Sequence, residues 1–421
     1  MSGYITRSIE KKLNSIINVF PVIMITGSRQ VGKTTLLNHM TLSSKKNINY
    51  VSLDNMLIRT KANEDPELFL KSYNTPLIID EFQYAPQLLS YIKIKVDEER
   101  KNSLFESKKP VETLYYLTGS QVFETMNDIS ESLAGRVGIL DLYSFSNREI
   151  NNLDEELFIP DINLIKKRKR TNNDSIKKLF ERIFNGSYPE IINNNGKNRE
   201  MFYEDYIRTY IERDVRKIIN IKDENKFIKF IASLAARTAQ EYNASEIASN
   251  IGVDSKTVDE WLSVLKNTNI IYLLQPFSNN NVSKIIKRPK IYFMDTGLAC
   301  YLAGYVSSET LEISVYGGAI FETYVVSEII KNFANNGKNA KRYLYYYRDQ
   351  NQKEIDLIIN YDNTIYPIEI KKSANPGVSA IKNFEVVKKF GLNIGNGIVL
   401  CMMSDILAID ENNYYVPIDY I

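Results

Sequence analysis

Residues 27–35, GSRQVGKTT, constrain the fold of this chain more than any other segment. They fit the pattern G-x-x-x-x-G-K-[ST], directly after the apolar run VIMIT and before the helix-compatible run TLLNHM. A glycine-rich loop between a strand and a helix turns successive backbone N–H groups toward an anion. Short apolar runs alternate with helix-compatible stretches up to residue 150, as in a parallel sheet flanked by helices. The sequence therefore predicts an α/β fold that carries a phosphate-binding loop.

Two residues of this loop have specific expected roles. Lys33 should reach the β- and γ-phosphates of a nucleotide, and the Thr34 hydroxyl should ligate the accompanying Mg²⁺. ATP and Mg²⁺ are therefore the predicted cofactors. The complete predicted nucleotide site is Gly27, Ser28, Arg29, Gln30, Val31, Gly32, Lys33, Thr34 and Thr35.

Two carboxylates follow the apolar run LII at residues 77–79. Asp80 and Glu81 would emerge at the carboxyl edge of the sheet, where the ligands of α/β folds bind. Asp80 is expected to hold the Mg²⁺ shell, and Glu81 to orient and polarise an attacking water. The plain alternative is a carboxylate pair that begins a surface loop.

Three further residues are candidates for the same site. Thr118 and Ser120 end the third apolar run, YYLTGS, where either hydroxyl would hydrogen-bond the γ-phosphate or water. Arg136 would stabilise transition-state charge at the nucleotide of a neighbouring subunit, which requires a homo-oligomer. A structural ion pair is an equally good interpretation of Arg136.

Together the segments GSRQVGKTT, LIIDEFQYAP, LTGSQ and ESLAGRVGILDLYSFSNREI resemble the bacterial and archaeal AAA+-like ATPases. The later segments GSYPE, YIRTYIERDVRKI, FMDTGLACYLAG and GAIFETYVVSEII resemble the same family, so the resemblance covers nearly the whole chain. It implies ATP binding. Because the C-terminal domain of this family is described as of unknown function, the resemblance leaves the biological role open.

Composition and periodicity divide the chain into four predicted segments. Residues 1–150 form the AAA+-like P-loop ATPase domain, and residues 151–222, which are polar and helical, form a lid or connector. Residues 223–295 follow the order helix, helix, turn, helix and two strands, as in a winged helix-turn-helix. Residues 296–421 mix a helix with strands, as in a second α/β or α+β domain, which a resemblance to nucleases implies to be nuclease-like.

The predicted helix-turn-helix rests on the apolar spacing of NASEIASNIGVDSKTVDEWLSVLKN on both sides of Gly252. Acidic residues on its second helix, among them Asp254 and Glu260, oppose an approach to phosphate. DNA binding and contact with a protein partner therefore both stay open. The side chains that would face a DNA groove or its phosphates are Ser255, Lys256, Thr257, Asp259, Lys284, Lys287, Arg288 and Lys290.

The run EIDLIINYDNTIYPIEIKK predicts a hairpin that turns at residues 361–363. It would place Asp356 near Glu369 on the partner strand, with Lys371 on the same face as Glu369. Carboxylates that bind Mg²⁺ and a lysine that stabilises developing charge suit phosphodiester cleavage. This D-x(12)-E-x-K spacing resembles the PD-(D/E)XK nuclease superfamily, and the resemblance implies Glu322 as a further acidic ligand. An amphipathic hairpin with a polar outer face gives the same pattern without cleavage.

Composition excludes several other classes of protein. A net charge of +2 gives no global field that attracts nucleic acid. One histidine and two cysteines leave no His/Cys zinc cluster and no Ser/His/Asp triad. No apolar run approaches the roughly 20 residues that span a bilayer, and the first residues are too polar for a secretory signal. We therefore expect a cytoplasmic protein without a membrane partner.

The leading hypothesis is an oligomeric, ATP- and Mg²⁺-dependent machine that acts on DNA through its C-terminal domains. Its rival is a nucleotide-controlled switch or scaffold whose C-terminal domains bind a protein partner and cleave nothing. A kinase would share the loop chemistry, but Glu81 directly after Asp80 favours hydrolysis.

Overall fold

The computed structural model describes residues 3–43, 47–107, 112–119, 133–171, 175–210, 215, 223–278 and 288–421. The chain divides into two compact units. The first consists of Thr6–Tyr143 with Asn267–Asn269, and the second contains Ser144–Lys266 and Ile270–Ile421. The predicted segments 151–222, 223–295 and 296–421 therefore lie almost entirely in one compact unit.

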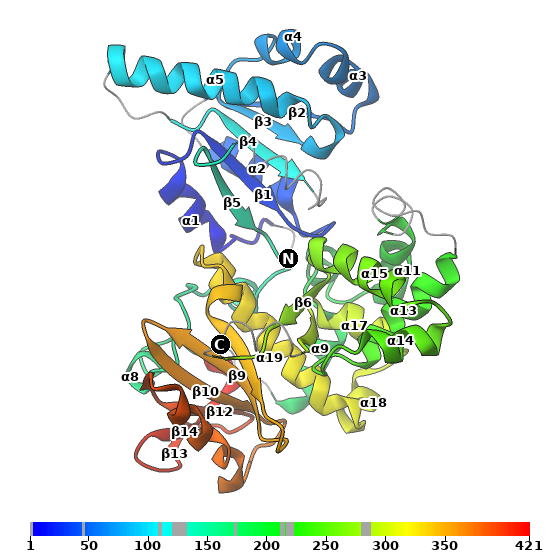
Figure 1. Cartoon of the computed structure of the whole chain (residues 1–421), viewed down its shortest axis with the longest axis vertical. Helices are drawn as coiled ribbons and strands as arrows, with labels where there is room; N and C mark the ends of the chain where they lie inside the picture. Colours follow the sequence, from blue (N-terminus) through cyan, green and yellow to red (C-terminus); the bar gives the residue numbers. More distant parts are fainter. Residues whose placement is uncertain are drawn as a thin grey trace. The chain divides into compact units, whose positions relative to one another are not determined.

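The first unit is built on a five-stranded parallel sheet (Figure 1). Its strands are β1 (Val22–Thr26), β2 (Asn49–Ser52), β3 (Leu77–Asp80), β4 (Tyr115–Gly119) and β5 (Val137–Asp141). They follow the order β2–β3–β4–β1–β5, and all neighbours are parallel. Every residue of β1, β3 and β4 is buried, as in a parallel sheet that is covered on both faces. The predicted α/β fold is confirmed.

Helices connect these strands and bring the functional loops to one edge of the sheet. They are α1 (Ile9–Ile16), α2 (Lys33–Ser43), α3 (Met56–Glu64), α4 (Pro66–Lys71) and α5 (Leu88–Asn102), with the short turns η1 (Phe82–Tyr84) and η2 (Ser103–Ser107). In α1, Ile9, Leu13 and Ile16 are buried at helical spacing and fix this helix on the core. Because β4 lies between β1 and β3, the loops after these two strands emerge on either side of β4.

Short helices open the second unit, in the region predicted as a lid or connector. In the longest amphipathic one, Leu179, Phe180 and Ile183 are buried together on one face. This face packs against helices that follow much later in the sequence. The helices are α7 (Asn147–Ile150), α8 (Ile162–Ile165), α9 (Ile176–Asn185), α10 (Pro189–Asn193) and α11 (Arg199–Tyr210).

Three helices and a two-stranded antiparallel sheet follow in the predicted order. They are α13 (Glu224–Ala236), α14 (Ala244–Ile251), α15 (Ser255–Asn267), β6 (Ile271–Leu274) and β7 (Lys290–Phe293). Gly252 ends α14 with a φ of +69°, a conformation that suits glycine and turns the chain sharply into α15. The rings of Phe227 and Phe230 on α13 pack against Trp261 on α15. These ring contacts pack α13 against α15, and the winged helix-turn-helix stays a prediction.

The C-terminal part combines helices with a mixed sheet. Its helices are α17 (Thr296–Leu302), α18 (Ser308–Ile313) and α19 (Tyr316–Asn335), with the short turns η4 (Ala340–Arg342), η5 (Val378–Ile381), η6 (Phe384–Phe390) and η7 (Ile418–Tyr420). Its strands are β8 (Leu344–Arg348), β9 (Glu354–Tyr361), β10 (Thr364–Ile370), β11 (Asn393–Ile394), β12 (Gly397–Cys401), β13 (Leu407–Ala408) and β14 (Asn413–Pro417). The sheet order is β13–β14–β12–β10–β9–β8, with β11 beside β10.

The hairpin of β9 and β10 has the predicted turn. Asp362 and Asn363 adopt φ values of +48° and +58°, which is the left-handed conformation that a tight two-residue hairpin turn needs. Ile368 pairs with Leu357 in the antiparallel register, so the ends of β9 and β10 that carry Asp356 and Glu369 lie side by side.

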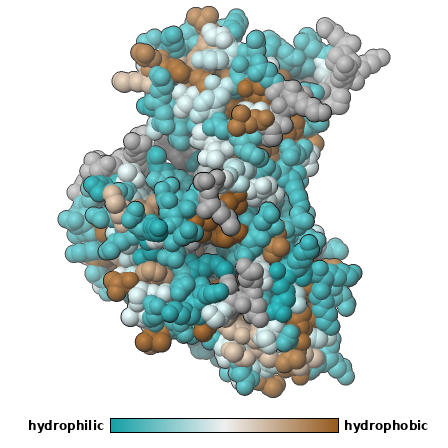
Figure 2. Space-filling view, turned by 180° about the vertical axis from the view of Figure 1, so that it is seen from behind, coloured by the Kyte–Doolittle hydropathy of each residue, from teal (hydrophilic) through white to brown (hydrophobic). Residues whose placement is uncertain are grey.

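Hydrophilic residues cover most of the face drawn in Figure 2, and apolar residues appear on it in separate patches. Within the described residues, no helix combines the length and the apolar character needed to cross a membrane.

Candidate functional site

The phosphate-binding loop has the backbone conformation that its glycines predict. Gly27 and Gly32 adopt φ values of +152° and +93°, and Gln30 between them has a φ of +59°. A Cβ atom on Gly27 would lie 2.1 Å from the carbonyl oxygen of Leu142, so only glycine fits there. The loop therefore curls tightly between the end of β1 and the start of α2.

Lys33 is the first residue of α2, and its side chain folds back over the loop. Its ammonium group donates to the carbonyl oxygens of Gly27 and Ser28, both at 2.9 Å. Only 7% of Lys33 is exposed. The cation is thus held directly above the loop whose N–H groups are expected to bind phosphate.

Asp80, at the end of β3, is surrounded by hydroxyl groups. The Thr34 hydroxyl lies 3.1 and 3.0 Å from its two carboxylate oxygens, and the Tyr50 hydroxyl donates to Oδ2 at 2.9 Å. The Thr118 hydroxyl donates to Oδ1. Burial, followed by the charge of Asp80, raises the pKa of Tyr50 to about 12, so Tyr50 is a donor at neutral pH. Asp80 itself is 4% exposed.

Glu81 is held by two residues that the sequence did not assign to it. It has a left-handed backbone, with a φ of +56°, and its N–H donates to the Thr118 hydroxyl at 3.1 Å. Its carboxylate accepts a hydrogen bond from the side-chain amide of Gln83. Thr118 therefore connects Asp80 with Glu81. The other hydroxyl candidate, Ser120, lies outside the described residues.

Arg7 holds the phosphate-binding loop through hydrogen bonds to backbone carbonyl oxygens. Its guanidinium donates to the carbonyl oxygen of Val31 at 2.9 Å and to that of Tyr143 at 2.7 Å, and the residue is 3% exposed. Val31 belongs to the loop, and Tyr143 follows β5. Arg7 thus ties the phosphate-binding loop to the segment after the neighbouring strand. The sequence could not reveal this link, because a single arginine before α1 belongs to no recognisable motif.

Arg136 lies directly before β5, and its carbonyl accepts from the N–H of Val22 at the start of β1. It is therefore at the edge of the sheet opposite to the phosphate-binding loop. Its guanidinium forms a two-pronged ion pair with Asp97 on α5, at 2.7 and 3.0 Å, and this hydrogen bonding lowers the pKa of Asp97. Within the chain, Arg136 thus forms an ion pair. Its role at a neighbouring subunit stays a prediction.

The second predicted centre brings Asp356, Glu369 and Lys371 together. The ammonium of Lys371 lies 2.6 Å from Glu369 Oε1 and 3.7 Å from Asp356 Oδ2. Asp356 Oδ2 also accepts the backbone N–H of Ile370 at 2.9 Å. The second oxygen of Glu369 is buried and has no hydrogen-bond partner among the described residues. Burial, and then the charge of Asp356, raises the pKa of Glu369 to about 8.

Glu322, on α19, belongs to the same electrostatic cluster but has other partners. Its carboxylate accepts from Tyr292 at 2.6 Å and from Lys290 at 3.1 Å, and Lys290 also binds Glu354 at 2.5 Å. Burial raises the pKa of Glu322 to about 7. Among the described residues, no three carboxylate, imidazole or thiolate side chains form a group able to hold a metal ion.

The place of Lys290 corrects an expectation. The sequence suggested that Lys290 lies on a wing and contacts DNA phosphates, but the residue is only 3% exposed. It is the first residue of β7 and pairs with the partly buried carboxylates of Glu322 and Glu354, which offset the cost of burying its charge. Of the other wing residues, Lys284 and Lys287 lie outside the described residues.

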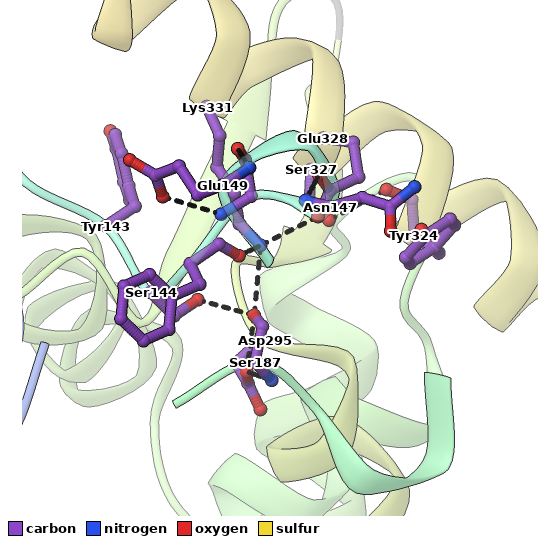
Figure 3. Close-up of polar contacts among 12 residues, drawn as sticks. Tyr143, Ser144, Asn147, Glu149, Ser187, Asp295, Tyr324, Ser327, Glu328 and Lys331 are labelled. Carbon is purple, nitrogen blue, oxygen red and sulfur yellow. Dashed lines mark hydrogen bonds and ion pairs between the residues drawn. The ribbon is translucent and has the colours of Figure 1, made fainter. Parts of the chain in front are cut away.

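A buried polar cluster in the second unit was not predicted (Figure 3). Lys331 of α19 donates to Glu328 Oε1 at 2.9 Å, to Ser187 Oγ at 3.0 Å and to the carbonyl oxygen of Phe145 at 3.0 Å. Glu328 in turn accepts the backbone N–H of Asn147 at 2.7 Å. These residues come from SFSNREI, GSYPE and α19, so the cluster joins segments that are far apart in the sequence.

Family comparisons divide the chain into three parts. Residues 19–151 match the AAA domain family, residues 176–309 match a domain of unknown function (DUF8612), and residues 317–421 match another (DUF4143). The AAA match covers β1 to β5, so the first unit is similar to AAA-type P-loop domains. The match over residues 176–309 covers part of the predicted connector, the predicted helix-turn-helix and the start of the predicted C-terminal segment.

Relatives along most of the chain exist in mycobacteria. Uncharacterized protein Rv2008c of Mycobacterium tuberculosis and Uncharacterized protein Mb2031c of Mycobacterium bovis are each 26% identical over 374 residues. The aligned part is 89% of this chain and 75% of each relative.

Several solved structures are similar to this chain at low sequence identity. The Walker-type ATPase PABY2304 of Pyrococcus abyssi is 15% identical, with 70% of this chain and 94% of that chain covered and a TM-score of 0.42. The RuvB Holliday junction branch migration motor of Thermotoga maritima is 18% identical, with 63% and 88% covered and a TM-score of 0.30. The ORC2 protein of Aeropyrum pernix is 13% identical, with 76% and 92% covered and a TM-score of 0.30.

Proposed function

We propose that this chain binds ATP with Mg²⁺ at residues 27–35 and hydrolyses it. The observation that carries the proposal is the contact of Thr34 with both oxygens of Asp80, at 3.0 and 3.1 Å. This contact joins the start of α2 to the end of β3, where Glu81 follows directly. A binding loop, a metal-binding carboxylate and a base are therefore adjacent.

The residues fit both cofactors. Gly27 lets the loop pass close to the carbonyl oxygen of Leu142, where a side chain would not fit, and the loop leads directly into the N-terminus of α2, as in a phosphate site. Thr34 and Asp80 offer the hard oxygen ligands that Mg²⁺ prefers. When bound, Mg²⁺ would neutralise charge on the phosphates.

Each residue of the site would then have its own role in ATP hydrolysis. Lys33 would exchange the carbonyl oxygens of Gly27 and Ser28 for phosphate oxygens. Glu81 would accept a proton from the attacking water, because its carboxylate follows directly on Asp80 at the same sheet edge. Thr118 would hold the Asp80 carboxylate and the backbone of Glu81 together, because its hydroxyl donates to Asp80 and accepts the N–H of Glu81. Arg136 would complete the site of a neighbouring subunit in a homo-oligomer.

The C-terminal centre supports a second proposal, a nuclease-like domain that acts on DNA. The unpartnered oxygen of Glu369 beside Asp356 would hold a cation, and Lys371 would stabilise charge on a phosphate. Glu322 would become a further ligand of this cation only if its carboxylate lost its hydrogen bonds from Lys290 and Tyr292. The helix-turn-helix would supply DNA contacts, although Asp259 on α15 is engaged by Tyr242 at 2.8 Å.

The rival proposal is a nucleotide-controlled switch whose C-terminal domains bind a protein and cleave nothing. Incubation of the purified chain with ATP, Mg²⁺ and single-stranded, duplex or branched DNA separates the two. Cleavage by the wild type that Lys371→Ala and Asp356→Asn both abolish supports the nuclease. Intact DNA in every case refutes it and leaves the switch.

The ATPase proposal is tested by phosphate release. Wild-type protein should release inorganic phosphate from ATP without any added acceptor, which distinguishes hydrolysis from kinase activity. Lys33→Ala should lose both nucleotide binding and turnover. Lys71→Ala, which removes an exposed lysine of α4 outside the predicted nucleotide site, should retain turnover. Failure of the wild type to release phosphate across Mg²⁺ concentrations would refute the proposal.

A further inference from the structure

Gln83 holds the carboxylate of Glu81 from only two residues away. Glu81 has a φ of +56°, and this left-handed turn begins η1, which contains Gln83. The turn allows the Gln83 amide nitrogen to donate to Glu81 Oε2. The hydrogen bond from Gln83 therefore fixes the carboxylate of a residue whose own backbone conformation is unusual.

Among the described residues, the oxygen end of the Gln83 amide has no partner. Gln83 Oε1 is buried and accepts no hydrogen bond from the described residues. Most buried polar atoms in folded proteins are paired, and an unpaired one calls for a specific reason. Here the reason is orientation, because the amide has turned its nitrogen toward Glu81 and its oxygen toward β4.

Gly119 makes room for this orientation. A Cβ atom on Gly119 would lie 2.7 Å from Gln83 Oε1, whereas its next contacts are at 3.7 Å. Gly119 has no left-handed backbone that would require glycine. The space at the end of β4 therefore serves the Gln83 side chain and not the backbone of β4.

We infer that Gln83 is a positioning residue for ATP hydrolysis, which orients the Glu81 carboxylate toward the attacking water, and that Gly119 is small to admit it. The inference rests on the proposed hydrolysis. The Gln83 amide donates to one carboxylate oxygen of Glu81 and leaves the other oxygen to accept the proton. The accepting oxygen therefore has one fixed orientation toward the attacking water. Correct orientation of a base affects the chemical step and not the affinity for ATP.

The test compares the wild type with Gln83→Met, which keeps the length of the side chain and removes the donor. We expect kcat to fall about tenfold or more, while KM for ATP and the affinity for a fluorescent ATP analogue stay within about twofold. Gly119→Ala should give the same change because it displaces the amide. The double variant should be no slower than the slower single variant, since both changes remove one interaction.

Gln83→Glu supplies an independent readout. A second carboxylate beside Glu81 disfavours its charged form and raises its pKa, so the rise of kcat with pH should move to higher pH. A merely structural residue would lower the melting temperature and leave this profile in place.

The outcomes separate the two proposals. If the wild type is active and Gln83→Met has a normal kcat, the role of Gln83 is wrong. The same holds if the losses of Gln83→Met and Gly119→Ala add up in the double variant. Both outcomes leave the proposed hydrolysis in place. A wild type that binds ATP and never releases phosphate would overturn the hydrolysis and, with it, the role of Gln83.

Discussion

The Thr34 hydroxyl lies 3.0 and 3.1 Å from the two carboxylate oxygens of Asp80. These residues are the predicted metal ligands from two different strand ends, and their contact shows that the loop after β1 and the end of β3 converge. Tyr50 and Thr118 bind the same carboxylate from β2 and β4. Residues from four elements thus meet at Asp80.

Removing the Thr34 hydroxyl should weaken the use of Mg²⁺. We expect Thr34→Val to raise the Mg²⁺ concentration for half-maximal ATP hydrolysis by roughly 10- to 100-fold, because a metal-shell contact is lost. Thr34→Ser keeps the hydroxyl and should stay within about twofold. Equal Mg²⁺ dependence in the wild type and Thr34→Val would show that Thr34 does not contact the ion.

Removing the charge of Lys331 should destabilise the second unit strongly. Lys331 and Glu328 are both buried, and the loss of one partner from a buried ion pair costs about 3–5 kcal/mol. Urea unfolding followed by the fluorescence of Trp261, the only tryptophan, measures this cost in the same unit. Lys331→Met combined with Glu328→Gln leaves no unpaired charge and should be more stable than Lys331→Met alone. A cost below about 1 kcal/mol for Lys331→Met would contradict the role assigned to this cluster.

The C-terminal centre should make stability depend on pH when no divalent cation is present. The folded-state pKa values of Glu322 and Glu369 are raised to about 7 and about 8, so the folded protein binds protons more tightly than the unfolded chain. This stabilisation is complete below the unfolded pKa and is lost as pH rises through about 7 to 8. We expect the melting temperature to fall between pH 6 and pH 9, by an amount that corresponds to a few kcal/mol.

Glu369→Gln is the control for that pH dependence, because an uncharged amide of the same shape replaces the protonated acid. The variant should show a flatter profile and a higher melting temperature than the wild type at pH 9. The sequence holds one histidine, so few other groups titrate in this window. Parallel profiles for the wild type and Glu369→Gln would contradict the assignment.

Arg136 is tested by mixing two inactive variants. Lys33→Ala has a defective site and an intact Arg136, while Arg136→Ala has the opposite defect. If Arg136 acts on a neighbouring nucleotide, mixed oligomers regain ATP hydrolysis that neither variant shows alone. Asp97→Asn breaks the ion pair and keeps Arg136, so it should retain turnover. Equal losses in Asp97→Asn and Arg136→Ala, with no recovery on mixing, would assign Arg136 to the ion pair only.

Much of the first site could be predicted because its signals are local. The loop motif stands between a strand and a helix, and Asp80 and Glu81 directly follow an apolar run, so strand order brings them together. The hairpin of β9 and β10 was predictable for the same reason, since its turn residues Asp362 and Asn363 favour a left-handed backbone.

Other contacts could not be predicted, because they depend on how distant elements pack. From the sequence, Lys290 looks like one of several basic surface residues. Its carboxylate partners are known only from the packing of β7 against α19 and β9. Tyr50 reaches Asp80 through the register of two parallel strands. The contact of Gln83 with Glu81 depends on a left-handed residue that is not a glycine, for which the sequence gives no sign.

The most direct test of the account is a paired measurement of ATP binding and phosphate release for the wild type and Glu81→Gln. The wild type should bind ATP in the presence of Mg²⁺ and release phosphate continuously. Glu81→Gln should bind ATP with similar affinity and release phosphate at least about 100-fold more slowly, because only the proton acceptor is lost. Equal rates of phosphate release, or no ATP binding by the wild type, would contradict the account.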